Sequence, residues 1–319
     1  MKFRSRIASL VAGTALALSA TATTAVAADF PDRPINLIVG YKAGGGVDTY
    51  ARALAKVAPQ YLNDQPVVVV NKPGGGGLIG GRFVADQPPT GYSLYLSSAG
   101  SMVLRNLAKR QVVSSQDFKQ VATIGELTAG VFVPASSEIK TLDELIAKLQ
   151  SSDTKLRWGH TGRGNVWHVA GVGLLDKNGL KAKDVPFKGG SGVRSAVISG
   201  QVDFAVIGAH LGRGFEKDIR QLAVLSDSRH PAVPEIPTAA ELNVEYTKVS
   251  SPIVVMAPKR VSDATVGKLS EAITAIAKDA RFAEVLSNAG LPTVSLDASE
   301  SQDLIDNARA NWKPLLGAK

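Results

Sequence analysis

Short apolar runs alternate with amphipathic stretches over roughly the first hundred residues. The runs at 35–39, 66–70 and 92–96 are bounded by Pro or Gly, which is typical of buried strands. Between them, apolar residues recur at helical spacing over 47–58 and 79–86. This order of strand, helix, strand, helix, strand predicts a parallel α/β sheet in this part of the chain.

The same alternation starts again in the middle of the chain. The expected strands lie at 131–133, 156–159, 185–187, 202–207 and 222–225. The expected helices lie at 142–149, 166–177 and 193–199. Thr141 and Glu144 have the spacing of a capping box, in which two side chains satisfy free backbone N–H groups at a helix start.

The last third returns to the pattern of the first. The remaining expected elements are a strand at 253–257 and helices at 263–278, 280–289 and 299–312. Pro314 is expected to stop the last helix. We expect two domains, the first formed by 28–125 together with 252–319 and the second by 126–251. The chain would cross between them twice, which makes a hinge beside a cleft.

The amino terminus has the layout of a secretory signal peptide. Three basic residues among the first six precede an apolar run over about 7–18, and small residues end the segment. We expect residues 1–27 to be removed by cleavage after Ala27. A membrane anchor is the alternative, but polar residues interrupt the run and it is short for a bilayer. No later stretch reaches about 18 apolar residues, so the exported chain is expected to be soluble.

Composition and charge exclude several functions. The 319 residues include no Cys and four His, which excludes thiolate metal sites, thiol nucleophiles and disulfide scaffolds and argues against a multi-histidine metal site. We predict neither a metal nor a cofactor. The net charge of +8 falls to +5 once the three basic residues of the signal segment are removed. Lys and Arg are scattered, which argues against nucleic acid and leaves a mild attraction for small anions.

One arrangement recurs at four places, where a strand ends in a glycine-containing loop that opens directly into a helix. The loops lie at 40–47, 71–79, 159–166 and 187–193. In a parallel sheet such loops gather beyond the carboxyl ends of the strands, where ligands bind. Their N–H groups and the positive helix ends stabilise a carboxylate or phosphate. Any one loop is explained by a tight turn, but the repetition favours an anion-binding site.

Side chains beside these loops have two possible roles, ligand contact or local structure. They are Tyr41, Lys42, Asp48, Arg163, His168 and Lys188. Asp48 begins the first predicted helix, where the helix dipole favours a carboxylate, and a scaffold role is slightly favoured. Lys42 either meets an anion or is solvated. A lone His is more often structural than a ligand, so His168 is not expected to bind a metal and can hydrogen-bond the loop before it.

Enzyme motifs find little support. Residues 75–80 match G-x-G-x-x-G after a strand, but no acidic residue for a ribose follows about 20 positions later, and G-x-x-x-x-G-K-[ST] is absent. A hydrolase could draw on Ser98, Ser101, Ser191 or Ser195 with His160, His168 or His210. None of these serines stands in G-x-S-x-G, so this alternative depends on composition alone.

An ordered set of motifs extends over essentially the whole chain after residue 30. It comprises Pro31–Ile35, Gly44–Asp48 with Arg52, Asn71–Gly80, Pro89–Leu94, Gly162–His168, Val185–Gly189, Gly200–Asp203, Arg229–Thr238, Ala257–Pro258 and Trp312. As a set they resemble the periplasmic solute receptors of tripartite tricarboxylate transporters, the Bug-type receptors. The resemblance implies an α/β periplasmic-binding-protein architecture whose two domains close like a flytrap on a ligand.

The function implied by this resemblance is capture of a small carboxylate in the periplasm and its delivery to a membrane permease. The ligand would be a di- or tricarboxylate, an acidic amino acid or an aromatic acid. The protein would be a monomer and not an enzyme. Two alternatives stay open: an exported hydrolase with a cleft Ser and His, and a binding protein that serves a membrane sensor.

The ligand contacts expected from the glycine loops and the resemblance come from both domains. In the first domain they are Tyr41, Lys42, Ala43, Gly44, Gly45, Gly46, Asp48 and Ser98. In the second they are Thr161, Gly162, Gly164, Asn165, His168, Gly189, Gly190 and Asp203. Backbone amides and ordered waters would hold the carboxylate. Departures from the family's usual residues at Gly40, Lys42, Asn165 and Trp167 leave the ligand's identity open.

Overall fold

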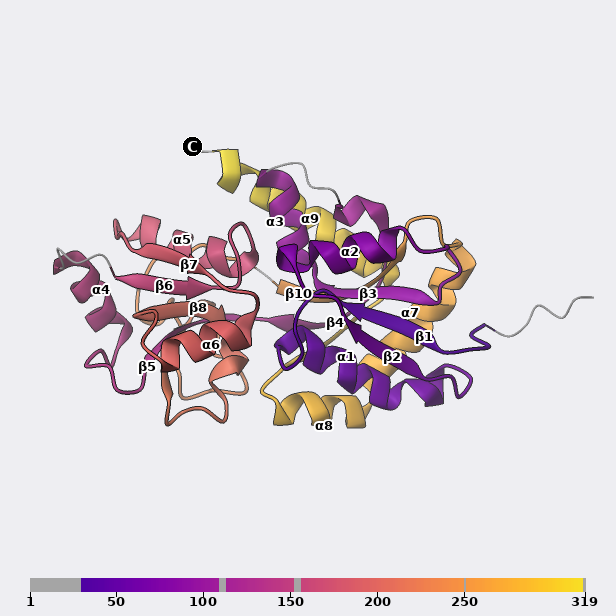
Figure 1. Ribbon diagram of the computed structural model, residues 1–319, viewed down its shortest axis with the longest axis horizontal. Helices are drawn as coiled ribbons and strands as arrows, with labels where there is room; N and C mark the ends of the chain where they lie inside the picture. The colour runs from indigo at the N-terminus through magenta and orange to yellow at the C-terminus, as the bar shows by residue number, and fades with distance from the viewer. Residues whose placement is uncertain (1–29, 109–112, 152–155, 250, 318–319) are drawn as a thin grey trace, which may run out of the picture.

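The computed structural model describes residues 30–108, 113–151, 156–249 and 251–317, and it forms two lobes side by side (Figure 1). The predicted signal peptide, residues 1–27, lies outside the described residues. No helix within the described ranges is long and apolar enough to cross a membrane. The colours of Figure 1 show that the two ends of the chain share one lobe, while the middle of the chain forms the other.

The first lobe is built on a six-stranded sheet with the order β11-β4-β10-β3-β1-β2. Its strands are β1 (Ile35–Val39), β2 (Val67–Asn71), β3 (Ser93–Ser98), β4 (Phe118–Leu127), β10 (Ser251–Pro258) and β11 (Thr293–Leu296). β1 pairs in parallel with β2 and β3, as predicted, whereas β10 runs antiparallel to β3 and β4. The sheet is therefore mixed, because β4 leads toward the second lobe and β10 brings the chain back.

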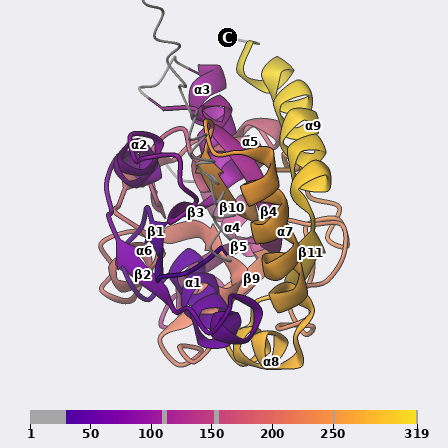
Figure 2. The same cartoon turned by 90° about the vertical axis from the view of Figure 1, so that its right-hand side faces the viewer.

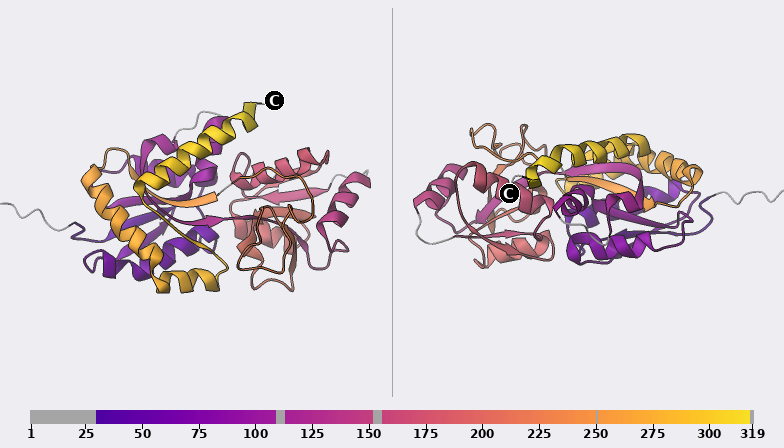
Figure 3. Two further views of the ribbon diagram at one scale, coloured as in Figure 1. Left: turned by 180° about the vertical axis from the view of Figure 1, so that it is seen from behind. Right: turned by 90° about the horizontal axis from the view of Figure 1, so that it is seen from above.

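Helices cover both faces of this sheet. They are α1 (Gly46–Val57), α2 (Leu78–Ala85), α3 (Ala99–Ala108), α7 (Asp263–Lys278), α8 (Ala280–Asn288) and α9 (Ala298–Gly317). In Figure 2, α7 and α9 lie along one side of the lobe and α2 on the opposite side. Figure 3 shows α9 running along the first lobe with its end toward the second.

The second lobe is built on a five-stranded sheet with the order β7-β6-β8-β5-β9. Its strands are β5 (Ala129–Pro134), β6 (Arg157–His160), β7 (Lys183–Pro186), β8 (Phe204–Gly208) and β9 (Ile219–Val224). Its helices are α4 (Leu142–Ser151), α5 (Val166–Lys177) and α6 (Gly190–Ile198), and a 3-10 turn, η4 (Ala209–Gly212), follows β8. β6 pairs in parallel with β7 and β8. Trp158, Phe132 and Phe204 are fully buried in this lobe.

Several predicted elements match the structure closely. Helices α5 and α7 have the predicted bounds. The capping box at α4 is also present, since the Glu144 N–H donates to Thr141 Oγ1 at 3.2 Å and the Thr141 N–H donates to Glu144 Oε2 at 3.3 Å. The bounds of these helices and the capping box depend on residue spacing and capping chemistry within a few positions, so the sequence predicts them well.

Other elements differ from the prediction. Helix α6 starts at Gly190, three residues earlier than expected, and α3, β4 and β11 were not predicted. The expected stop at Pro314 is wrong, because α9 continues to Gly317. A proline removes one backbone donor but does not forbid a further turn where packing holds the helix, and Trp312 is buried just before it. The exact domain bounds, 28–125 with 252–319 and 126–251, stay a prediction.

The packing of Gly125 gives a test of the first lobe. A Cβ at this position on β4 would stand 2.1 Å from Cε1 of the buried Tyr50 ring, whose hydroxyl donates to the Pro292 carbonyl. We expect Gly125→Ala to lower the free energy of unfolding by about 1–3 kcal/mol through overpacking. Gly267→Ala is the control, because Gly267 is exposed in α7 with open space around it, and it should stabilise by about 0.5–1 kcal/mol. Denaturant unfolding of both variants measures the difference. Equal stabilities would contradict the close contact between Gly125 and Tyr50.

Candidate ligand-binding site between the two lobes

A partly open pocket, here called the inner pocket, lies between the lobes. Its lining residues come from the loops that follow β1, β3, β6, β7 and β8, together with neighbouring helix starts and β4. They are Tyr41, Lys42, Gly45, Gly46, Val47, Ser98, Leu127, Thr161, Trp167, Gly189, Gly190, Ser191, Gly208, His210 and Leu211. The strand ends of both sheets therefore converge on one place, as expected for ligand sites in α/β folds.

A second pocket adjoins the first. The adjoining pocket shares Tyr41, Thr161 and Gly189 with the inner pocket. Its further lining residues are Gly40, Pro73, Gly74, Gly75, Gly76, Gly162, Arg163, Pro186, Phe187 and Lys188. The Tyr41 hydroxyl donates a hydrogen bond to the Gly76 carbonyl at 3.2 Å, so this ring stands where the two pockets meet.

Three helices that begin near these pockets lack side-chain caps. Helices α1, α2 and α6 follow Gly45, Gly77 and Gly189, and none of these N-cap residues offers a side-chain acceptor. By contrast, Asn165 caps α5, Ser262 caps α7 and Asp279 caps α8. Free N–H groups and the positive ends of helix dipoles attract anions. The inner pocket thus receives two such helix starts, α1 from one lobe and α6 from the other.

Asp48 holds the loop before α1 rather than lining the inner pocket. It is 2% exposed, and its carboxylate accepts hydrogen bonds from the Gly44 N–H, Arg52 Nε and Asn71 Nδ2, each at 2.9 Å. Burial alone would raise the pKa of Asp48, but the hydrogen bonds from Arg52, Gly44 and Asn71 outweigh it and hold this pKa below its usual value. Both carboxylate oxygens of Asp48 already accept hydrogen bonds from the loop and from neighbouring side chains. The geometry therefore supports a scaffold role for Asp48.

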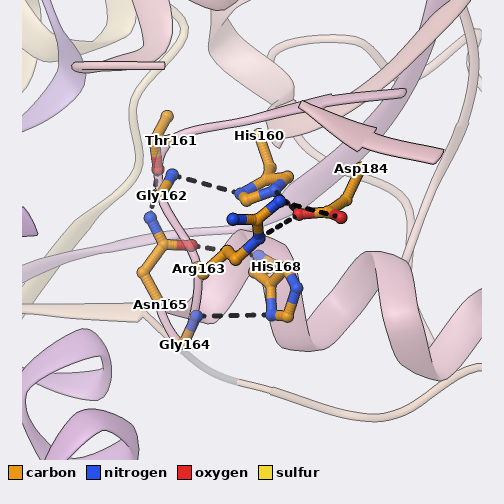
Figure 4. A network of polar contacts seen from close by, with 8 residues as sticks. All are labelled: His160, Thr161, Gly162, Arg163, Gly164, Asn165, His168 and Asp184. Carbon is orange, nitrogen blue, oxygen red and sulfur yellow. Dashed lines mark hydrogen bonds and ion pairs between the residues drawn. The ribbon is translucent and has the colours of Figure 1, made fainter. Parts of the chain in front are cut away.

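A network of side chains supports the loop at 161–165 (Figure 4). His160 Nδ1 accepts from the Gly162 N–H at 3.1 Å, and His168 Nδ1 accepts from the Gly164 N–H at 3.3 Å. Asn165 caps α5 by accepting from the His168 N–H at 3.0 Å, and its amide donates to Thr161 Oγ1. These side chains fix the backbone and leave Thr161 to line both pockets.

His160, His168 and Asp184 lie close enough to suggest a metal site, with one ligand atom from each within 4.8 Å of the others. The hydrogen bonds argue against it. Since His160 Nδ1 accepts from Gly162, its Nε2 carries the proton and donates to Asp184 Oδ2 at 3.2 Å. Asp184 also accepts from Arg163 Nε at 2.6 Å. Both the lone pair of His160 and the charge of Asp184 are already engaged, so the cluster is built for support.

Of the expected contacts, half line the inner pocket. These are Tyr41, Lys42, Gly45, Gly46, Ser98, Thr161, Gly189 and Gly190. Gly162 lines the adjoining pocket, and Ala43 and Gly44 lie in the exposed loop before α1. Asp48, Gly164, Asn165 and His168 belong to the supporting networks described above.

Asp203 lies away from both pockets. It precedes β8, whereas Gly208 at the other end of this strand lines the inner pocket. Its carboxylate accepts from the Arg157 N–H at 2.7 Å and forms an ion pair with the Arg157 side chain. The structure therefore gives Asp203 a role in joining the far ends of β6 and β8.

Sequence reasoning missed part of the lining. The residues not expected there are Val47, Leu127, Trp167, Ser191, Gly208, His210 and Leu211. The rule that found the other loops also applies to the strand predicted at 202–207, because its carboxyl end leads directly to Gly208 and η4. That loop has no glycine run, and His210 was expected there only as the possible base of a hydrolase.

A serine–histidine pair is not formed by the candidates in the inner pocket. The Ser98 hydroxyl pairs with the Ser251 hydroxyl at 2.6 Å. His210 Nε2 is buried and has no hydrogen-bond partner within the described ranges. The side chain of Ser101 lies outside the described residues. Ser98 and His210 thus lack the hydrogen bond that a nucleophile and its base require.

Two α/β lobes with converging strand ends and a pocket between them define a solute-binding protein of the flytrap type. Residues 50–319 match the model of the tripartite tricarboxylate transporter family receptor, and the chain belongs to this family. The resemblance predicted from the motifs is confirmed. The family is one of transporter receptors, and two solved structures at 26% identity are binding proteins, so this chain is a binding receptor and not an enzyme.

Individual relatives cover nearly the whole chain. The UPF0065 protein in the tcbD-tcbE intergenic region of Pseudomonas sp. strain P51 is 30% identical over 312 residues, which cover 96% of this chain and 93% of that protein. The solved periplasmic binding protein BugD has a TM-score of 0.82 at 26% identity and covers 90% of this chain and 97% of its own. R. palustris Rpa4515 with adipate has a TM-score of 0.84 at 23% identity, covering 90% and 97%, and shows the fold alone.

The buried histidines predict how stability depends on pH. Burial lowers the pKa of His160, although its hydrogen bonds to the Asp184 carboxylate and with the Gly162 N–H oppose the shift. Burial also lowers the pKa values of His210 and His230. In the unfolded chain these rings take up protons near their ordinary pKa of about 6.5, and in the folded chain only at lower pH. We expect the contribution of these histidines to the free energy of unfolding to be complete well above pH 6.5 and to decrease steadily as the pH falls toward 5.

Urea unfolding at pH values from 8 to 5 measures this slope. A His160→Gln variant is the control, because it removes one of the contributing rings and should flatten the decline. A stability that stays level or rises as the pH drops through this window would contradict the expectation.

Proposed function

We propose that this receptor captures a small carboxylate between its lobes and delivers it to a membrane permease of the tripartite tricarboxylate type. The observation that carries the proposal is the pair of uncapped helix starts, α1 and α6, which reach the inner pocket from opposite lobes. Their N–H groups offer hydrogen bonds to an anion without a fixed counter-charge. Lys42 adds one exposed cation at the same place.

Contacts across the pocket support a closing motion. His210 of the second lobe lies against Gly46 of the first, so close that a Cβ at Gly46 would stand 2.7 Å from His210 Nε2. A ligand that binds both helix starts interacts with both lobes only when they are together. Such a ligand shifts the population toward the closed form because its affinity for that form is higher.

The cellular setting follows from the same proposal. Residues 1–27 would be removed by cleavage after Ala27, and the remaining chain would act in the periplasm as a monomer. The ligand would be a di- or tricarboxylate, an acidic amino acid or an aromatic acid. Its release would be to the permease rather than to a sensor.

A ligand screen tests the proposal. Residues 28–319 are heated with malate, citrate, adipate, glutamate and benzoate in turn, and each hit is recovered and checked for chemical change. A ligand at about 100 times its Kd stabilises the fold by roughly 2.7 kcal/mol, which raises the Tm. We expect at least one carboxylate to stabilise the protein and to be recovered intact. A consumed hit, or no hit among these compounds, would overturn the proposal.

Lys42 gives a second test once a carboxylate is found. Its side chain is exposed, so its attraction for the anion is screened, and we expect Lys42→Ala to weaken binding by roughly 0.5–1 kcal/mol at low salt. The loss should shrink as salt is added. Lys56→Ala is the control, because Lys56 is an exposed cation at the other end of α1. Calorimetric titration of both variants measures the difference, and equal affinities would return Lys42 to a purely solvated role.

A further inference from the structure

One polar group in the inner pocket has no explanation in the fold. His210 stands on η4, directly after β8, and its Nε2 is buried without a hydrogen-bond partner in the part of the chain that the structure describes. Buried polar atoms in proteins almost always have a partner. Because His210 lines the inner pocket, the missing partner is best supplied by a bound ligand.

The position of this ring relates it to the start of α1. A Cβ at Gly46 would stand 2.7 Å from His210 Nε2 and 2.8 Å from its Cε1. The imidazole therefore lies directly against the first residue of the uncapped helix. A carboxylate that accepts hydrogen bonds from the α1 N–H groups would lie within reach of Nε2 as well.

His210 is neutral at physiological pH. Burial, with added repulsion from His230 and Arg194, lowers the pKa of His210 to about 3. Arg194 lies over the Phe215 ring and donates to the Leu211 carbonyl, and Lys42 is the further cation on the pocket lining. A neutral imidazole that carries its proton on Nε2 is a donor to a carboxylate without adding a buried charge.

The rest of the pocket wall combines apolar side chains with the hydroxyl residues Ser98, Thr161 and Ser191. Val47, Leu127, Trp167 and Leu211 line it, and each is at most 7% exposed. Lys42, the one Lys or Arg among the lining residues, lies in the exposed loop before α1. A second carboxylate held deep in this pocket would lose its hydration and would meet uncharged N–H and hydroxyl donors, but no cationic side chain beyond Lys42.

We infer that His210 is a specificity-determining residue whose Nε2 donates a hydrogen bond to a ligand carboxylate at the start of α1, and that the inner pocket selects a monocarboxylate with an apolar body. This inference rests on the proposed function, because it names the ligand class of the same site. Benzoate and isovalerate represent that class. Malate and adipate represent the competing class, in which a second carboxylate reaches the adjoining pocket beside Lys188.

Calorimetric titration of the wild-type protein with these four acids tests the ligand class. We expect benzoate or isovalerate to bind about tenfold or more tightly than malate and adipate, since a desolvated, unpaired carboxylate is costly. Tighter binding of malate or adipate would overturn the inferred class while leaving the receptor function intact. Binding of none of the four would overturn this inference, and the wider ligand screen would then decide the proposed function separately.

Two substitutions test the donor. His210→Phe keeps a ring and removes the nitrogen, and we expect it to weaken monocarboxylate binding by about tenfold or more, as for loss of a hydrogen bond to a charged group. His210→Gln keeps an N–H donor and should restore most of the affinity. Wild-type affinity in His210→Phe, or equal losses in both variants, would overturn the role of Nε2.

A measurement on the unmodified protein keeps the test independent of folding. With ¹⁵N-labelled histidine, the ring nitrogens of His210 should shift on addition of the bound monocarboxylate, and the spectrum should show Nε2 protonated. The rings of His160 and His168, which are held by loop N–H groups, serve as internal references. An unchanged His210 signal at saturation would overturn the inference.

Discussion

The starts of α1 in one lobe and of α6 in the other carry no side-chain cap and lie at the inner pocket, where backbone N–H groups attract an anion. The rest of the structure is organised around these two helix starts. Gly45 and Gly189 offer no side-chain cap to these N–H groups, whereas α5, α7 and α8 are capped by Asn165, Ser262 and Asp279. Because the two starts belong to different lobes, an anion between them also joins the lobes. Under the proposed function, binding and closure would thus have a single electrostatic origin.

A carboxylate and two imidazole side chains near the site hold the backbone of the pocket loops in place. Asp48 holds the loop before α1, and the pair His160 and His168 holds the loop before α5 by accepting its N–H groups. The hydrogen bonds of Asp48 and of the Nδ1 atoms of both histidines go to these loops and to neighbouring side chains. Their contribution is rigidity, since amide donors are useful for recognition only when their directions are fixed in advance. This division explains why residues close to the pocket in sequence do not all touch it.

Much of the fold was predictable because its signals are local. The strand at 35–39, helix α5 and the capping box of Thr141 and Glu144 follow from apolar spacing and cap chemistry within a few residues. The direction of β10 was not predictable in this way, because it depends on the chain returning from another lobe. In the site, the loops were predictable because each contains glycine between a predicted strand and a predicted helix. His210 was not expected in the lining because it packs against Gly46, more than 160 positions away in the sequence. Asp203 was expected at the ligand but lies at the other end of β8, because its position in the sequence does not tell which end of the strand faces the pocket.

The contact between His210 and Gly46 also links the movement of the lobes to protons. Burial of the ring, whose Nε2 lies against Gly46 of the other lobe, lowers the pKa of His210 and keeps it neutral. When the lobes separate, water reaches the imidazole and its proton affinity returns toward that of a free histidine. If the lobes open as the proposed function requires, opening in mildly acidic solution would take up a proton and closing would release one, so acidity would favour the open form. The pH of the compartment then sets part of the balance between holding a solute and letting it go.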